Sequence, residues 1–215
     1  MNKNYMIRQE TEKDYSVVEN LTREAFWNVY KEGCDEHYMV HVMRGHEDFI
    51  KELALVLEVD GEIIGNVMYM KAMLKDKAGN EKPILSFGPI SIHPEYQRMG
   101  YSRILLEYSF EIAEKLGYDV IANFGDPANY VARGFRSSHR YHVCMEGDVY
   151  PAALLVKQLK ENALDGRTWY YHESPAFEAM TEEGLAQFEA QFPPKKKEWK
   201  PSQEIFYIQS HSTVR

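Results

Sequence analysis

The chain has 215 residues, 44% of them hydrophobic and 13% aromatic, which is enough for one sizeable α/β domain with a packed core and excludes a disordered segment. Its 33 acidic residues outnumber the 25 basic ones, and the net charge of −8 argues against non-specific binding of nucleic acid, which needs a basic surface. There is no apolar run of the roughly 18 residues that cross a membrane, no secretory signal at the start, and only two cysteines, Cys34 and Cys144, so we expect a cytoplasmic protein.

The first elements in chain order are a short strand and an amphipathic helix. Residues 6–9 form the strand, and Thr11 or Asp14 caps a helix that runs to about Tyr30. A polar stretch with several histidines then leads to a short helix near residues 49–53. The apolar face of the first helix is marked at helical spacing by Val17, Val18, Leu21, Ala25 and Phe26.

A hairpin, a strand and a long helix follow. The dipeptide Asp60-Gly61, a strong turn signal between two apolar runs, predicts the hairpin. Residues 84–93 are predicted to form a strand, and a helix begins after Gly100 and ends at Gly117. We expect a single apolar stripe on this helix, formed by Tyr101, Ile104, Leu105, Tyr108, Ile112 and Leu116.

Residues 118–125 form the next predicted strand. Because a helix separates this strand from the one at residues 84–93, the two should be parallel, with a right-handed crossover. A short helix then ends at Gly134, and residues 135–143 are expected to form a terminal hairpin.

The sequence changes character beyond residue 150. Residues 154–159 are a short apolar segment, one more strand is expected within residues 168–180, and a helix is expected at residues 181–192. The proline- and lysine-rich stretch at residues 192–202 is predicted to be a solvated surface.

The chain is therefore divided into a main domain, residues 1–150, and a C-terminal extension, residues 151–215. The extension has several large aromatic side chains, but about 65 residues rich in proline and lysine bury little surface alone. We expect it to pack on the main domain.

The stretch "QRMGYS", residues 97–102, places polar and small residues between the strand at residues 84–93 and the long helix. A helix N-terminus presents unpaired backbone N–H groups and the positive end of the helix dipole, which suits a phosphate. From this local pattern alone, an ordinary strand-to-helix turn explains the residues equally well. The dipeptide Gly88-Pro89 stands within the preceding strand, where proline removes a hydrogen-bond donor and predicts a bulge or a sheet edge.

The order of these elements resembles the GNAT superfamily of acyl-CoA-dependent N-acetyltransferases. The stretch "ISIHPEYQRMGYS" is similar to the pyrophosphate loop of that family, with Gln97, Gly100 and Ser102 at the motif positions. Ser102 departs from the glycine or alanine that the family prefers, but serine is small and its hydroxyl can donate to a phosphate oxygen.

Two further motifs carry the resemblance. The stretch "NYVARGF" is similar to the family element in which a tyrosine, here Tyr130, precedes a Gly-Phe pair by four residues, and "EVDGEIIGNVMY" is similar to the central hairpin. The match covers residues 5–145, and the extension more loosely resembles that of a bacterial subgroup of predicted acetyltransferases.

The resemblance implies an α/β (α+β) fold whose mixed, mostly antiparallel sheet is splayed at the acyl-CoA site and flanked by helices. It also implies that acetyl-CoA is the co-substrate, that the backbone of residues 98–103 cradles the diphosphate, and that the pantetheine arm pairs with the strand before it; a plain structural bulge at Gly88-Pro89 is the alternative. The residues assigned to coenzyme A are Ile90, Ser91, Ile92, Gln97, Arg98, Met99, Gly100, Tyr101, Ser102, Arg103 and Asn123.

The implied reaction is direct attack of a neutral amine, on a small molecule or a peptide, on the thioester of acetyl-CoA. Tyr130 is the candidate acid for the departing thiolate, with a packed tyrosine as the alternative. The base is not identified; Glu36, His37 and His41, before the hairpin, are candidates on the acceptor side, with ordinary polar helix residues as the alternative.

Other functions remain to be weighed. A catalytically degenerate acyl-CoA-binding sensor or partner module is the main alternative, and intact Tyr130 and loop residues favour the enzyme. Cys34, His37, His41 and His46 invite a metal site, but no cysteine pair or tight spacing supports one, and no metal is expected. An amine acceptor and a second copy of the chain are the allowed partners; nucleic acid and membrane are not expected.

Overall fold

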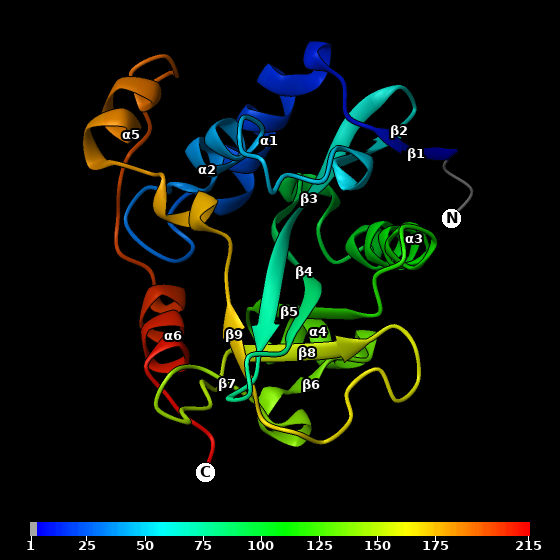
Figure 1. Ribbon diagram of the computed structural model, residues 1–215. Coiled ribbons are helices and arrows are strands. Elements are labelled where there is room, and N and C mark those ends of the chain that lie inside the picture. Colours follow the sequence, from blue (N-terminus) through cyan, green and yellow to red (C-terminus); the bar gives the residue numbers. More distant parts are fainter. Residues whose placement is uncertain (1–3) are drawn as a thin grey trace.

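A nine-stranded sheet organises residues 4–215, the part of the chain that the computed structural model describes (Figure 1). The strands are β1 (Tyr5–Gln9), β2 (Leu55–Val59), β3 (Glu62–Lys75), β4 (Glu81–Ile92), β5 (Val120–Phe124), β6 (Arg136–Ser137), β7 (Val143–Cys144), β8 (Leu154–Gln158) and β9 (Trp169–His172). The α-helices are α1 (Tyr15–Phe26), α2 (Glu36–Met43), α3 (Tyr101–Lys115), α4 (Pro127–Tyr130), α5 (Glu182–Glu189) and α6 (Pro201–Ser210).

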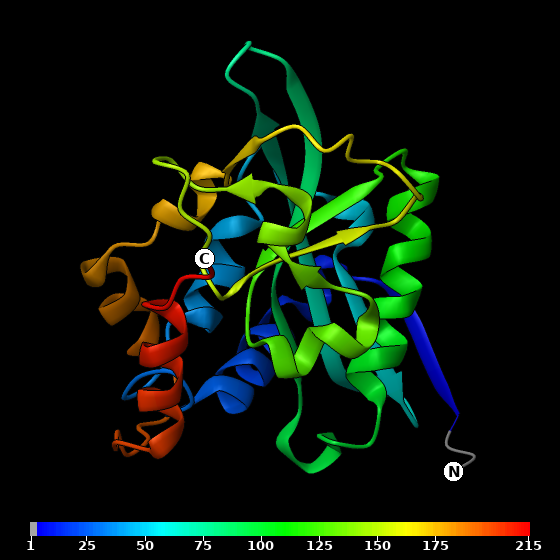
Figure 2. The same cartoon turned by 90° about the horizontal axis from the view of Figure 1, so that it is seen from below.

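The sheet is mixed and mostly antiparallel. Its main path runs β1-β2-β3-β4-β5-β8-β6, while β9 pairs with β3 and β7. Only the β4–β5 and β7–β9 pairs are parallel among these strands, so the parallel pairing predicted across the long helix is confirmed. Helices α1 and α2 cover one face of the sheet and α3 covers the other (Figures 1 and 2). Within residues 4–215, no helix is both long and apolar enough to cross a membrane.

The predicted hairpin is confirmed as β2 and β3. Asp60 and Gly61 both have positive φ, 53° and 87°, which a two-residue turn between twisted strands requires. Helix α1, however, ends at Phe26 rather than near Tyr30. Asn28 adopts the left-handed conformation with φ 62°, and its side-chain oxygen accepts from the Gly33 N–H at 2.8 Å, so the chain turns out of the helix there.

Helix α2 was not predicted, and the helix expected near residues 49–53 is only a 3₁₀ turn at Lys51–Leu53. The buried side chains of α2 are His37, Val40 and Met43. Because a histidine occupies the buried face, the apolar periodicity that announces an amphipathic helix is interrupted here. The predicted face of α1 also needs a correction, since Val17 is 46% exposed.

The predicted stripe of α3 is partly wrong. Tyr108 and Leu116 are 41% and 42% exposed, and the buried face is displaced around the helix towards Leu106 and Phe110. A polar residue, Ser109, lies at the centre of this face, where its hydroxyl lies 2.7 Å from that of Tyr69 on β3 and donates to a backbone carbonyl. Because the buried face of α3 includes a serine, the apolar pattern of the sequence indicated a neighbouring face instead.

The terminal hairpin predicted at residues 135–143 is also wrong. Strand β6 pairs with β8 and β7 pairs with β9, while residues 138–141 between β6 and β7 form a 3₁₀ helix. The short apolar segment predicted at residues 154–159 is strand β8, which lies between β5 and β6.

The extension contributes to the sheet. Strands β8 and β9 both follow residue 150, so the boundary placed there does not coincide with an edge of the sheet. Helix α5 confirms the helix expected at residues 181–192, whereas α6 was not predicted. Between α5 and α6, drawn in orange to red in Figure 1, the chain forms no helix or strand, and its Pro193 and Lys196 carbonyls accept from Arg23 and Trp27 at the end of α1. The division into a domain and an extension stays a prediction.

Candidate active site

The strands β4 and β5 separate at one end of the sheet. They pair at a single position, Leu85 with Ile121. Beyond it, β4 is distorted, because Val67 of β3 pairs with Ile90 and Tyr69 pairs with Phe87, which leaves two residues of β4 opposite one of β3. The extra residue falls at Gly88-Pro89, so the predicted bulge is confirmed.

The bulge leaves one edge of β4 without a partner strand in residues 4–215. The His93 N–H donates to the Ile64 carbonyl of β3 at 2.8 Å. Because peptide groups alternate in direction along an antiparallel strand, the N–H and C=O of Ser91 also point towards β3. The peptide groups of Ile90 and Ile92 therefore face the opposite edge, and the Ile92 carbonyl accepts from the Gln97 side-chain amide at 3.0 Å. A chain of amides, such as pantetheine, can pair with this edge in place of a strand.

The loop at residues 93–100 connects this edge to α3. Gly100 is the N-cap of α3 with φ 89°, a left-handed conformation that side chains rarely adopt, and an added Cβ would meet no atom within 4 Å. Arg98 is also left-handed, with φ 61°, and Met99 is 48% exposed. No side chain caps the start of α3, so the first backbone N–H groups of this helix face the open space beside Gly100.

The side chains near the N-terminus of α3 have different roles. Gln97 holds the loop against β4, and Arg103 pairs with Glu107 one turn further along the helix at 2.8 Å. Tyr101 is 6% exposed and packs its ring 6.0 Å from that of Tyr96. Ser102 is half-buried. The side chains of Gln97, Tyr101 and Arg103 are therefore engaged with the protein, and it is the uncapped backbone N–H groups at the start of α3 that can bind an anion.

Tyr130 lies at the end of the short helix α4, beside the bulge. Its ring packs 5.5 Å from that of Phe87 and 5.7 Å from that of Phe135. A Cβ at Gly125 would lie 2.4 Å from this ring, so only glycine fits there. Burial raises the pKa of the Tyr130 phenol above its usual value, and the phenol is therefore protonated at neutral pH.

Asn123, a predicted cofactor-binding residue, precedes Gly125 by two residues. It is 5% exposed on β5 and pairs with Leu155 of β8. Asp126 begins α4 and accepts from the Ala128 N–H at 2.9 Å, which fixes the turn between β5 and Tyr130.

The three candidates on the acceptor side lie in different surroundings. Glu36 opens α2, and burial, together with the charge of Asp35, raises its pKa to about 7. His37 has no exposed surface; its Nδ1 lies 3.4 Å from the Cys34 sulfur and its Nε2 lies 2.8 Å from the Glu189 carboxylate. A substrate cannot reach His37, which therefore has a structural position.

His41 lies on the surface, with its Nδ1 3.0 Å from the Glu19 carboxylate and its ring 4.5 Å from that of Phe188. Glu36 is partly exposed, and its raised pKa suits it to accept a proton at neutral pH.

Sequence reasoning missed Tyr30, whose ring packs 4.7 Å from that of Phe206 in α6. Burial, followed by the charges of Glu36 and Asp126, raises its pKa to about 12. The charges of Tyr30 and Asp126 also raise the pKa of Tyr130, after burial. The signal for Asp126 was present in the sequence, since an Asp-Pro pair before a short helix indicates an N-cap.

Neither cysteine is arranged as a nucleophile. Cys34 and Cys144 are both buried, and burial raises the pKa of the Cys34 thiol far above its usual value. Within residues 4–215, no three histidine, cysteine, aspartate or glutamate side chains are grouped so that they can hold a metal ion.

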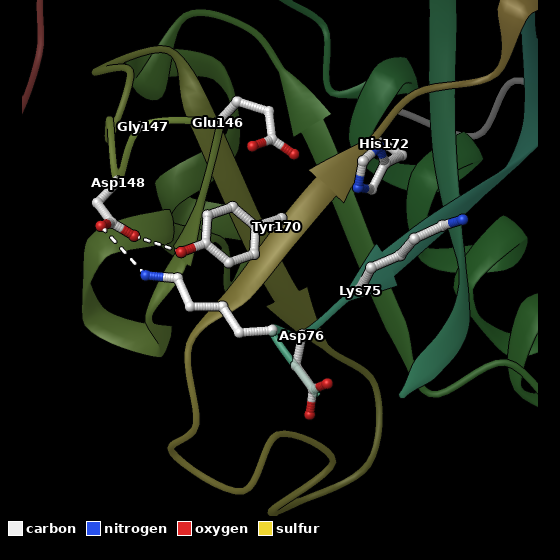
Figure 3. Close-up of a pocket in the computed structure, with 8 residues that line it drawn as sticks. Lys75, Asp76, Glu146, Gly147, Asp148, Tyr170 and His172 are labelled. Atoms are coloured by element: carbon white, nitrogen blue, oxygen red, sulfur yellow. Dashed lines mark hydrogen bonds and ion pairs between the residues drawn. The ribbon is translucent and has the colours of Figure 1, made fainter. Parts of the chain in front are cut away.

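A solvent-exposed pocket lies at the other end of the β3–β4 hairpin, where Lys75 pairs with Glu81 (Figure 3). This pocket of about 440 Å³ is open to solvent, and two of its lining residues, Lys75 and Asp76, pair with Glu81 and Arg167 outside the lining. Asp148 accepts from the Tyr170 hydroxyl at 2.5 Å and lies 3.5 Å from Lys77. Because the loop before α3 lies at the opposite end of β4, this pocket is not part of the candidate site.

A bulged strand with an unpaired edge, followed by a loop and a helix that opens at glycine, defines the class of acyl-CoA-binding transferases. The family model "Acetyltransferase (GNAT) family" matches residues 14–137, more than half of the chain. The chain belongs to this family and is an N-acetyltransferase. The predicted family, fold class and enzyme class are confirmed.

Similar proteins are known in sequence and structure. The chain is 28% identical to the uncharacterized N-acetyltransferase YhbS of Escherichia coli O157:H7 over 171 residues, 78% of this chain and 96% of that protein. The crystal structure of Escherichia coli YhbS in complex with CoA has a TM-score of 0.70, with 24% identity over 84% and 96% of the two chains. A Brucella melitensis GNAT acetyltransferase in complex with acetyl-CoA has a TM-score of 0.65, with 20% identity over 82% and 99%.

Proposed function

We propose that this acetyltransferase transfers the acetyl group of acetyl-CoA directly to a primary amine of a small molecule or peptide. The observation that carries the proposal is the unpaired edge of β4 beside the start of α3. Pantetheine amides pair with the peptide groups of Ile90 and Ile92, and the diphosphate takes the backbone N–H groups of residues 101–103. Two proteins of the same fold are described as complexes with CoA and acetyl-CoA.

Glu36 is the proposed base. Its carboxylate removes a proton from the substrate ammonium, and the neutral amine nitrogen then attacks the thioester carbonyl carbon. A carboxylate with a pKa of about 7 is half ionised at neutral pH and is a stronger base than an exposed glutamate. The charge that develops on the carbonyl oxygen is stabilised by a peptide N–H of the unpaired β4 edge.

Tyr130 is the proposed acid. As the carbon–nitrogen bond forms and the carbon–sulfur bond breaks, its hydroxyl donates a proton to the leaving thiolate of coenzyme A. Its position beside Phe87 and the bulge supports this role, because the thioester end of pantetheine would follow Ile90 along β4. The attacking nitrogen loses its second proton to solvent as the amide forms, and solvent returns a proton to Tyr130. A covalent acyl-enzyme is not required, and the buried cysteines offer none.

The proposal is tested by measuring release of the coenzyme A thiol from acetyl-CoA in the presence of a panel of primary amines. We expect release that depends on both the protein and the amine. Binding of acetyl-CoA without release for any amine would instead identify an acyl-CoA sensor. No binding of acetyl-CoA would contradict the proposed site itself.

A further inference from the structure

Helix α6 of the extension is held at both ends by hydrogen bonds to the rest of the molecule. At its start, the Gln203 side-chain amide donates to the Asn28 carbonyl of the α1–α2 loop at 3.2 Å. Beyond its end, the Ala152 N–H donates to the Ser212 carbonyl and the Val214 N–H donates to the Tyr150 carbonyl, both at 2.8 Å. The helix, drawn in red in Figure 2, therefore spans from the α1–α2 loop to the segment that leads into β8.

Two side chains of α6 reach the residues around Tyr130. The Phe206 ring lies 4.7 Å from that of Tyr30, and the Gln209 side-chain amide donates to Asp126 at 3.1 Å. Asp126 begins the helix that carries Tyr130. The side chain of Ile205, by contrast, is 55% exposed on the same helix.

We propose that α6 forms the outer wall of the acceptor site, and that Phe206, with Tyr30, selects amines whose ammonium group is attached to an aromatic or other apolar body. This inference rests on the proposed function, and it names the substrate class of the same site.

The chemistry of the wall supports this choice. The rings of Tyr30 and Phe206 meet, and Phe26 adds a third ring 5.7 Å from that of Tyr30, so the wall that α6 forms near Asp126 is aromatic. Carboxylates at Glu36 and Asp126 attract a cation before it is deprotonated, and aromatic faces bind both cations and apolar groups. The second ammonium group of a diamine would gain less from these rings than an aromatic or apolar body, because it keeps its hydration water while an apolar body buries its surface against them.

The test is equilibrium binding of 2-phenylethylamine and 1,4-diaminobutane to the full chain saturated with coenzyme A, measured by calorimetry. We expect 2-phenylethylamine to bind at least about tenfold more tightly than the diamine. Phe206→Ala should weaken binding of 2-phenylethylamine by about tenfold, with little effect on the diamine or on coenzyme A. Ile205→Ala, an apolar truncation on the same helix, should change neither amine.

Equal affinity for the two amines, or an unchanged affinity for 2-phenylethylamine in Phe206→Ala, would overturn the inference. So would an equal loss with Ile205→Ala, since that would indicate a general effect of α6 on folding. The thiol-release assay separates this failure from that of the proposed function. Turnover of amines without the expected discrimination overturns only the role of α6, whereas absence of turnover with every amine overturns the proposed reaction.

Discussion

The carboxylate of Glu189 in α5 accepts hydrogen bonds from the guanidinium of Arg23 in α1, at 2.5 to 3.2 Å. Arg23 is only 1% exposed, and it also donates to the Pro193 carbonyl at 2.9 Å. Its guanidinium lies between the rings of Trp27 and Phe192, 4.4 and 5.2 Å from their centroids. The extension is therefore held on α1 by a buried charge that has its partner in the extension.

Glu189→Ala should destabilise the protein markedly. Removing the carboxylate leaves the buried Arg23 guanidinium without its counter-charge, which typically costs about 3 kcal/mol of unfolding free energy or more. The free energy is measured by urea denaturation of the full chain. Gln187→Ala, on an exposed position of the same helix, is the control and should stay within about 0.5 kcal/mol of the parent. Equal stability of the two variants would show that the pair does not hold the extension.

Residues 151–215 should not fold alone. The two strands that they contain pair only with strands from the first 150 residues, since β8 joins β5 and β6 and β9 joins β3 and β7. Without these partners, the separate segment has unpaired strand edges and little buried apolar surface. Circular dichroism of the isolated segment during heating should show no cooperative transition. A cooperative transition would establish an independent domain.

Gly100→Asp should abolish binding of acetyl-CoA. At this position, a side chain is strained by φ 89°, and its carboxylate stands where the diphosphate would lie. Acetyl-CoA should raise the melting temperature of the parent protein and not that of the variant, because a ligand that binds only the folded state stabilises it. Gly79→Asp is a matched control, since Gly79 has φ 86° and open space but lies at the far tip of the β3–β4 hairpin. A shift retained by Gly100→Asp would contradict the placement of the diphosphate.

Glu36→Gln should lower turnover by about 10²-fold and remove a pH dependence. In the parent protein, turnover should rise as pH increases through about 7, because only the ionised carboxylate accepts a proton. The variant should lack this rise. Glu32→Gln, an exposed carboxylate of the same loop, should keep the parent profile. A parent-like profile in Glu36→Gln would exclude Glu36 as the base.

Glu36→Gln, although it lowers turnover, should raise the stability of the protein at alkaline pH. The pKa of Glu36 is raised from 4.5 to about 7 on folding, so the folded state keeps a proton that the unfolded state releases between these values. The unfolding free energy of the parent protein therefore falls as pH rises through this window. Glu36→Gln avoids that loss and should be more stable than the parent at pH 8 by on the order of 1–2 kcal/mol, but not at pH 4. Denaturation at the two pH values measures the difference.

The cofactor side of the site could be predicted from the sequence because its signals are local. Gly100 and Gly117 mark conformations with positive φ at the two ends of one helix, and Gly88-Pro89 marks the bulge in the strand before it. Each of these features depends on backbone geometry within a few residues. The strand, loop and helix therefore follow from consecutive residues.

The proposed acceptor side could not be predicted in the same way. Tyr30 and Phe206 come from distant parts of the chain, and only the packing of the extension brings their rings together. Helix α6 gives a poor helical signal, because its apolar residues 205–208 are consecutive in the sequence rather than spaced along one helical face. His37 was a misleading candidate, since sequence alone does not distinguish a buried histidine from one that meets a substrate.

Tyr130→Phe tests the proposed acid by removing a single hydroxyl. The ring contacts with Phe87 and Phe135 do not involve the hydroxyl, so folding and acetyl-CoA affinity should be nearly unchanged. Turnover at saturating acetyl-CoA should fall by about 10²-fold, the lower end for general acids, because coenzyme A thiolate is a fairly good leaving group. The loss should lie in kcat rather than in KM, since the hydroxyl acts on charge that appears only as the thioester breaks. Tyr108→Phe, on the exposed side of α3, is the matched control and should keep full turnover. Equal turnover of Tyr130→Phe and the parent would make Tyr130 a packing residue, with the thiolate protonated by the substrate or by water.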